Sequence, residues 1–182
     1  MPERPSIRSE RQHLAVRLVD QLAYLIDEVE AQRPLLRRLP AWVLEGRPFA
    51  GTWSIKEMYG ALAAADERVH LPVLRRLVAG EEPSCAEADL AALQACEPWN
   101  TLPLEALLDR VQAARRALVA FLRALPPEAW ERTARFGATQ RDLYACVHAI
   151  ILQDTDCLRE VGYRLHESGV YQGQASAAPH EA

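Results

Sequence analysis

The sequence has no long hydrophobic run. Its start, Met1 to His13, is polar and rich in arginine, and no later apolar stretch approaches the roughly 20 residues that a membrane-spanning helix needs. Acidic and basic residues are interleaved and leave a net charge of only -4, so the chain also lacks the basic stripe that follows a nucleic-acid backbone. We therefore expect a cytoplasmic protein that binds neither membranes nor nucleic acid.

Several chemical signatures are missing as well. The cysteines, Cys85, Cys96, Cys146 and Cys157, contain no CxxC pair and no zinc-like spacing. Cys146 and Cys157 fall in one predicted helix, about 16 Å apart along its axis, which is too far for a disulfide. There is no Ser-His-Asp signature, no phosphate-binding glycine loop and no dinucleotide fingerprint. These absences argue for reduced thiols and against the common hydrolases and nucleotide enzymes.

The composition is that of a folded chain. Of 182 residues, 49% are hydrophobic and 25% are charged, which suits one domain with a sizeable core. Residues 170–182 are rich in Ala, Gln and Ser and show no hydrophobic period. We predict a single domain over residues 1–169 and a disordered tail over 170–182.

Apolar residues recur every three or four positions in four segments, which is the spacing of amphipathic helices. The segments cover residues 9–33, 54–80, 102–125 and 139–168. No segment alternates convincingly like a strand, and no internal repeat is present. Four such helices bury their apolar faces most simply as a bundle, so the sequence predicts an all-α four-helix bundle.

Local signals mark where these helices begin and end. Ser54 and Glu57 have the spacing of a capping box at the start of the second helix. Pro72 lies inside the second helix and predicts a kink or a break there. Thr139 is the predicted N-cap of the fourth helix, and Gly169 is its predicted C-terminal cap. The long connection over 81–100 is expected to carry a short helix near residues 86–95.

The stretch Trp53-Ser54-Ile55-Lys56-Glu57 opens the second helix, two prolines end the third, and Gly137-Ala138-Thr139 precedes the fourth. This pattern resembles the DinB/YfiT-like superfamily over roughly residues 12–165. The resemblance implies an up-down-down-up bundle, frequent homodimers, and often a divalent metal held by three histidines between helices 2 and 4. Members include thiol-dependent transferases and isomerases, and many proteins of unknown activity.

The sequence departs from that family at the metal positions. The helix 2 histidine falls on Ala61, and the H-D-x-x-H pattern of helix 4 falls on Gln153-Asp154-Thr155-Asp156-Cys157, so only the aspartate remains. The candidate pocket is therefore Ala61, Gln153, Asp154 and Cys157, with no metal. The alternative is a divalent Ni, Zn, Fe or Mn ion held with the help of Cys157 or Asp154.

Helical spacing places Cys146, Ile150, Gln153 and Cys157 on one face of the fourth helix. We interpret Gln153 and Cys157 as buried packing residues, with the amide of Gln153 satisfied by hydrogen bonds. The alternative is that Cys157 is a nucleophile, which needs a nearby cation to lower its pKa. Arg68 of the second helix is a candidate for that cation, although a surface or bundle-end position is the more common outcome for an arginine.

For the remaining polar residues the sequence gives no reason to expect a functional role. His148 falls on the other side of the fourth helix from Gln153, and His13 and His70 are isolated and receive no role. Asp66 and Glu67 are expected on a solvated helical edge. A carboxylate turned into the bundle is the alternative for that pair.

We expect a helical-bundle protein that lacks the three metal-binding histidines of the family. It would bind a small molecule or a low-molecular-weight thiol between its helices, or act as a dimeric partner protein. The alternative is a metal-dependent or thiol-dependent transferase or hydrolase.

Overall fold

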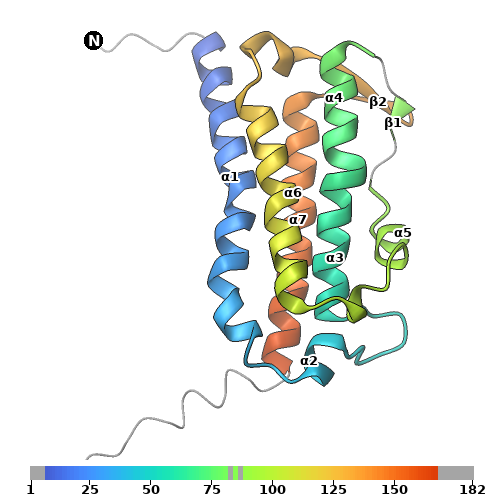
Figure 1. Ribbon diagram of the computed structural model, residues 1–182. Coiled ribbons are helices and arrows are strands. Elements are labelled where there is room, and N and C mark those ends of the chain that lie inside the picture. The colour runs from blue at the N-terminus through green and yellow to red at the C-terminus, as the bar shows by residue number, and fades with distance from the viewer. Residues whose placement is uncertain (1–6, 82–83, 86–87, 168–182) are drawn as a thin grey trace, which may run out of the picture.

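Four long helical segments lie side by side in the computed structural model, which describes residues 7–81, 84–85 and 88–167 (Figure 1). They are α1 (Ile7–Leu36), α3 (Ile55–Ala65) continued by α4 (Leu71–Ala79), α6 (Leu104–Arg123) and α7 (Leu143–Glu167). α1 and α7 run in one direction, and α3, α4 and α6 run in the other. This arrangement confirms the predicted up-down-down-up bundle. The predicted tail and the cap at Gly169 lie outside the described residues.

The connection from α4 to α6 runs back along the bundle, so that α3 and α6 are parallel (Figure 1). It carries the predicted short helix as α5 (Leu90–Ala95) and a 3-10 turn (Trp99–Thr101). Trp99 is buried against Gly60 of α3, where a Cβ atom would lie 2.2 Å from the indole ring. Only glycine permits this contact, which fixes the connection against the bundle.

The apolar core forms two clusters along the bundle. α6 supplies Leu107, Leu108 and Val111 to one cluster and Leu118, Val119 and Leu122 to the other. Arg115 lies between these two groups on the same helix and is wholly buried. The centre of the bundle is therefore polar, between two apolar ends.

A small sheet at one end of the bundle corrects the expectation that the chain has no strand (Figure 1). β1 (Ser84–Cys85) pairs in parallel with β2 (Thr133–Phe136), which pairs antiparallel with β3 (Thr139–Asp142). Strands this short cannot display the alternation that identifies a strand in a sequence. Gly137, with a φ of 57°, occupies the tight turn between β2 and β3.

The sheet also moves the start of the fourth helix. Thr139 lies in β3 opposite Phe136, so its prediction as an N-cap is wrong. Asp142 takes that place, because its Oδ1 accepts a hydrogen bond from the backbone N–H of Ala145 at 2.8 Å. The prediction for the second helix is confirmed, since Ser54 and Glu57 each accept a hydrogen bond from the other's backbone N–H.

The predicted interruption near Pro72 is a π-helical turn over Asp66–His70, between α3 and α4. Pro72 has no N–H to donate and lies in the first turn of α4. Such single π turns inside helices are frequent at functional sites. This one brings both Asp66 and His70 into buried positions.

Other connections are short. α2 (Ala41–Glu45) follows α1, and a 3-10 turn (Pro127–Glu131) follows α6. No described helix is long and apolar enough to cross a membrane.

Candidate functional site

Two neighbouring residues of α7 face different surroundings. Asp154 is buried and points toward α6, where Arg115 lies. Gln153 is half-buried and lines a cleft on another side of α7. Consecutive helical positions are about 100° apart, so adjacent side chains enter different environments. The candidate pocket predicted from the sequence is thus split between two sites.

The first site is a buried network centred on Arg115. Its Nε donates to Oδ2 of Asp66 at 2.7 Å, and its Nη2 donates to Oδ1 of Asp154 at 2.9 Å. Its Nη1 donates to Asp154 and to the backbone carbonyl of Leu22. Asp66 in turn contacts Nδ1 of His70 through Oδ1 at 2.8 Å. The network ties α1, the π turn, α6 and α7 together at the centre of the bundle.

The two carboxyl groups respond differently to sharing one guanidinium group. Burial opposes the ionisation of Asp66, but the charge of Arg115 and the hydrogen bond with His70 outweigh it and hold the pKa of Asp66 below its ordinary value. Burial raises the pKa of Asp154, and Arg115 only partly opposes that rise. The pKa of Arg115 is raised because the attraction of both carboxylates exceeds the effect of burial. Arg115 therefore stays charged.

This network corrects the solvated-edge expectation for Asp66, whose side chain is only 2% exposed. The alternative of a carboxylate turned into the bundle is confirmed for this residue. Glu67 is exposed, as expected, and forms an ion pair with Arg110. His70 is buried and is not isolated, because its Nδ1 is bonded to Asp66.

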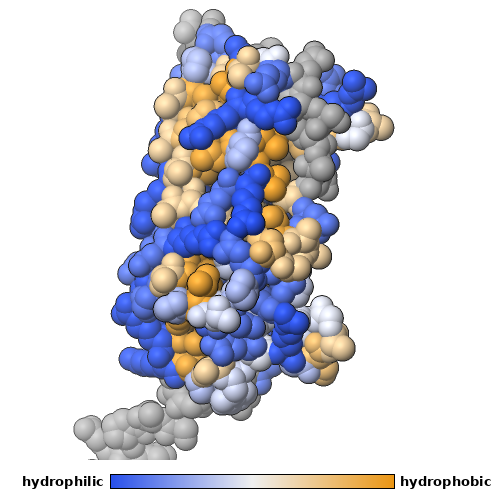
Figure 2. All heavy atoms as spheres, turned by 45° about the vertical axis from the view of Figure 1, so that its right-hand side comes forward, coloured by the Kyte–Doolittle hydropathy of each residue, from blue (hydrophilic) through white to orange (hydrophobic). Residues whose placement is uncertain are grey.

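The second site is the cleft, which we define by its lining from α3, the π turn, α4, the loop before α3, the start of α5, the hairpin of β2 and β3, and α7. Its volume is about 1040 Å³. Most of the lining is apolar; examples are Trp53, Met58, Val73, Leu90, Phe136, Ala149 and Ile150. Figure 2 shows apolar side chains exposed between hydrophilic ones on the side of the molecule that carries α4 and α5. The predicted face of Cys146, Ile150, Gln153 and Cys157 lines this cleft.

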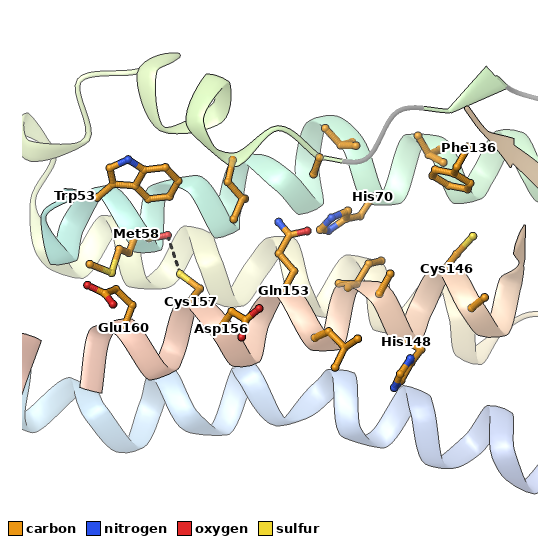
Figure 3. A pocket seen from close by; sticks show the side chains of 18 of the residues that line it. Trp53, Met58, His70, Phe136, Cys146, His148, Gln153, Asp156, Cys157 and Glu160 are labelled. Atoms are coloured by element: carbon orange, nitrogen blue, oxygen red, sulfur yellow. Dashed lines mark hydrogen bonds between the residues drawn. The ribbon is translucent and has the colours of Figure 1, made fainter. Parts of the chain in front are cut away.

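Gln153 and His70 bring polar atoms into the cleft and lie next to each other in it (Figure 3). Nε2 of Gln153 is buried and has no hydrogen-bond partner among the described residues. The expectation of a satisfied, buried Gln153 is therefore wrong for its nitrogen. Because Asp66 is held ionised, Nδ1 of His70 carries the proton and donates to it. Nε2 is then the ring nitrogen of His70 that remains to interact with a ligand.

Arg164 lines the cleft further along α7. The residue is only 9% exposed. Its Nε donates to Oε1 of Glu160 at 3.0 Å, but its Nη1 is buried without a partner in the described part of the chain. Among the described residues, two buried donor nitrogens of side chains that line the cleft therefore have no acceptor.

Cys157 is buried, as predicted, and its thiol contacts the backbone carbonyl of Met58 at 3.8 Å (Figure 3). Burial raises the pKa of this thiol to about 12, and the nearby charge of Asp154 adds to the rise. Arg68, the candidate cation for lowering the pKa of Cys157, forms an ion pair with Glu97 instead. The surroundings of Cys157 therefore oppose the thiolate that a nucleophile needs.

The family's metal positions supply poor ligands here. Ala61 is fully buried in α3 and offers no donor atom. Both carboxylate oxygens of Asp154 accept from Arg115, and the thiol of Cys157 is held protonated at neutral pH. No group of three or more His, Cys, Asp or Glu side chains in the described ranges is arranged to hold a metal ion. These residues do not fit a centre of three imidazoles.

The remaining histidines lie apart from Gln153. His148 is exposed and lies at the edge of the cleft, but Figure 3 shows its ring directed away from Gln153 and His70. This agrees with its predicted place on another side of the helix. His13 is exposed on α1.

Sequence reasoning missed three functional candidates, namely His70, Arg115 and Arg164. A signal was present for the first two. Asp66 and His70 have the i, i+4 spacing of facing helical side chains, and Arg115 lies on the apolar stripe of α6 between Val111 and Leu118. Arg164 gave no such signal, because a basic residue in the last turn of a helix is common.

Comparison with known proteins agrees with this architecture. No curated protein matches the sequence. The solved structure of YfiT from Bacillus subtilis, described as a probable metal-dependent hydrolase with an unusual four-helix bundle topology, is similar with a TM-score of 0.68. The two chains are 12% identical, and the match covers 93% of each. The model of the DinB superfamily matches residues 24–153, and the chain therefore belongs to the DinB superfamily.

Proposed function

We propose that this DinB-superfamily protein binds a small, mainly apolar molecule in the cleft and recognises a hydrogen-bonding group on it. The observation that carries the proposal is Nε2 of Gln153, which is buried and finds no acceptor among the residues that the structure describes. A buried donor left without a partner costs about 1–3 kcal/mol. A ligand carbonyl oxygen would supply the missing acceptor.

The shape and chemistry of the cleft support this proposal. Small-molecule sites commonly have volumes of about 300–1,000 Å³, apolar walls and a few polar groups that orient the ligand. The cleft, at about 1040 Å³, has such walls. Gln153 offers a donor, and the ring of His70 presents its second nitrogen on a neighbouring part of the surface. The pair suits a ligand that carries a carbonyl group and a nearby polar group.

We also propose that the three-histidine metal centre found in many relatives is missing from this chain. The support is the donor chemistry, since Ala61 has no ligand atom and Asp154 is engaged by Arg115. We derive no catalytic step from a metal or from Cys157. The homodimer and the low-molecular-weight thiol ligand implied by family resemblance stay predictions.

The cleft is tested with Nile red, a neutral dye that fluoresces in apolar surroundings. We expect saturable binding of one dye per chain. Ala149→Trp should abolish it, because Ala149 lines the cleft and the indole would fill the space. Ala117→Trp is the matched control, since Ala117 is exposed on α6 and is not part of the cleft. Absence of saturable binding, or equal loss in both variants, would refute the proposal.

The role of Gln153 is tested by displacing the dye with butyrophenone and with butylbenzene, which differ by one carbonyl group. Gln153→Leu should weaken butyrophenone about fivefold to tenfold, the value of one hydrogen bond, and leave butylbenzene unchanged. Equal effects on the two compounds would show that Gln153 contributes only shape.

A further inference from the structure

Arg164 gives the cleft a buried positive charge. Arginine keeps its charge in proteins, and its planar fork of N–H groups matches a carboxylate. A position in the last turn of α7 suits the helix dipole, but it leaves the buried Nη1 of Arg164 without an acceptor among the described residues. Nη1 of Arg164 therefore has a hydrogen-bonding capacity that none of the described residues uses.

The acidic groups near this end of the cleft are already paired. Glu160 accepts from Nε of Arg164, and Asp156 forms an ion pair with Arg159 at 2.6 Å. Glu160 is 50% exposed, so its ion pair with Arg164 is weakened by water. An incoming carboxylate thus meets a guanidinium group that already pairs with Glu160 through Nε, and its attachment point is Nη1 of Arg164, which has no partner among the described residues.

The spacing along α7 defines the shape of the ligand. Gln153 and Arg164 are three helical turns apart on the same face, which is about 16 Å along the axis. Both line the cleft, and apolar side chains such as Trp53 and Met58 line it with them. The cleft thus has Arg164 toward one end, an amide donor along its length and apolar walls, and Arg141 of β3 lines it as a second cation.

We propose that Arg164 anchors the carboxylate of an amphipathic carboxylic acid whose apolar body lies in the cleft. This inference rests on the proposed function and names the class of its ligand. A charge-assisted hydrogen bond is about twice as strong as a neutral one, so the carboxylate is a source of selectivity as well as affinity.

The test is displacement of Nile red by dodecanoate and by dodecanol, which share a chain length and differ in charge. For the wild type we expect dodecanoate to displace the dye at a concentration about tenfold lower. Arg164→Gln should remove this preference, and Arg164→Lys should retain part of it. Arg159→Gln is the matched control, because Arg159 is exposed on the same helix, and it should keep the full preference.

The outcomes separate the two proposals. Equal displacement by dodecanoate and dodecanol in the wild type would overturn the role of Arg164 while leaving ligand binding intact. A preference that survives in folded Arg164→Gln would overturn it as well, and would place the anion elsewhere. Failure of Nile red to bind the wild type would instead overturn the proposed function. The wild-type comparison needs no variant, so equal displacement would overturn the role of Arg164 even if the substitutions impair folding.

Discussion

The two polar regions beside α7 differ in how completely their groups are paired. On the side facing α6, Asp154 and Arg115 belong to a network that unites four segments of the bundle. On the side facing the cleft, Gln153 and Arg164 each keep a buried nitrogen that has no partner in the described part of the chain. Buried polar groups that are fully paired stabilise one arrangement of the helices. Buried groups without a partner can still form a hydrogen bond with a ligand. Burial alone therefore does not show whether a polar side chain supports the fold or is available to bind a ligand.

Disrupting the network around Arg115 should have the largest effect on stability. Arg115→Met removes the shared cation and leaves two carboxyl groups buried, so we expect a loss of about 3–5 kcal/mol in the free energy of unfolding. Urea denaturation measures it. Arg116→Met is the matched control, because Arg116 is the next residue of α6 and is exposed; its effect should stay within about 0.5 kcal/mol.

A restored variant sharpens this result. Adding Asp66→Asn and Asp154→Asn to Arg115→Met removes the uncompensated charges, so much of the lost stability should return. If Arg115→Met alone is as stable as the wild type, the network does not hold the helices together.

A second prediction concerns Cys157, which lines the cleft, is buried and keeps its thiol proton. The raised pKa of about 12 leaves little thiolate at pH 8. Alkylation by iodoacetamide should be on the order of a thousandfold slower than at an ordinary thiol, and it should rise about tenfold per pH unit. Mass spectrometry should compare a variant that retains only Cys157 with one that retains only Cys96, which is exposed. Equal rates at pH 8 would contradict the buried, protonated thiol.

The smallest effect is expected from the unpaired amide itself. Gln153→Leu removes a donor that has no acceptor, so the protein without ligand should become more stable by about 1 kcal/mol. Gln112→Leu is the matched contrast in α6, because Nε2 of Gln112 donates to the carbonyl of Ile26 and its Oε1 accepts from Arg33. That change should cost about 1–3 kcal/mol in a thermal or urea melt. A comparable loss in both variants would mean that Gln153 is satisfied after all.

Local patterns explain which sequence predictions succeeded. The capping box at Ser54 depends on residues within one helical turn of each other and is confirmed. The interruption predicted at Pro72 lies before it, as the π turn over Asp66–His70, and Pro72 itself is in the first turn of α4. The hairpin of β2 and β3 was missed, because four residues per strand show no clear alternation. It displaced Thr139 from the helix start and gave that place to Asp142. The sequence predicted correctly a feature that a few neighbouring residues specify, and it missed strands that are too short to show a pattern.

The helical periods, the absence of histidine at positions 61, 153 and 157, and the common face of Cys146, Gln153 and Cys157 follow from the order of residues alone. The packing of the bundle is what pairs Asp154 and leaves Nε2 of Gln153 without a partner among the described residues. Arg115 lies 39 residues before Asp154 and 49 residues after Asp66, so no local pattern links the three. Helical period follows from the backbone of each segment, whereas the pairing of a buried group depends on which distant side chain the packed bundle brings within hydrogen-bond distance.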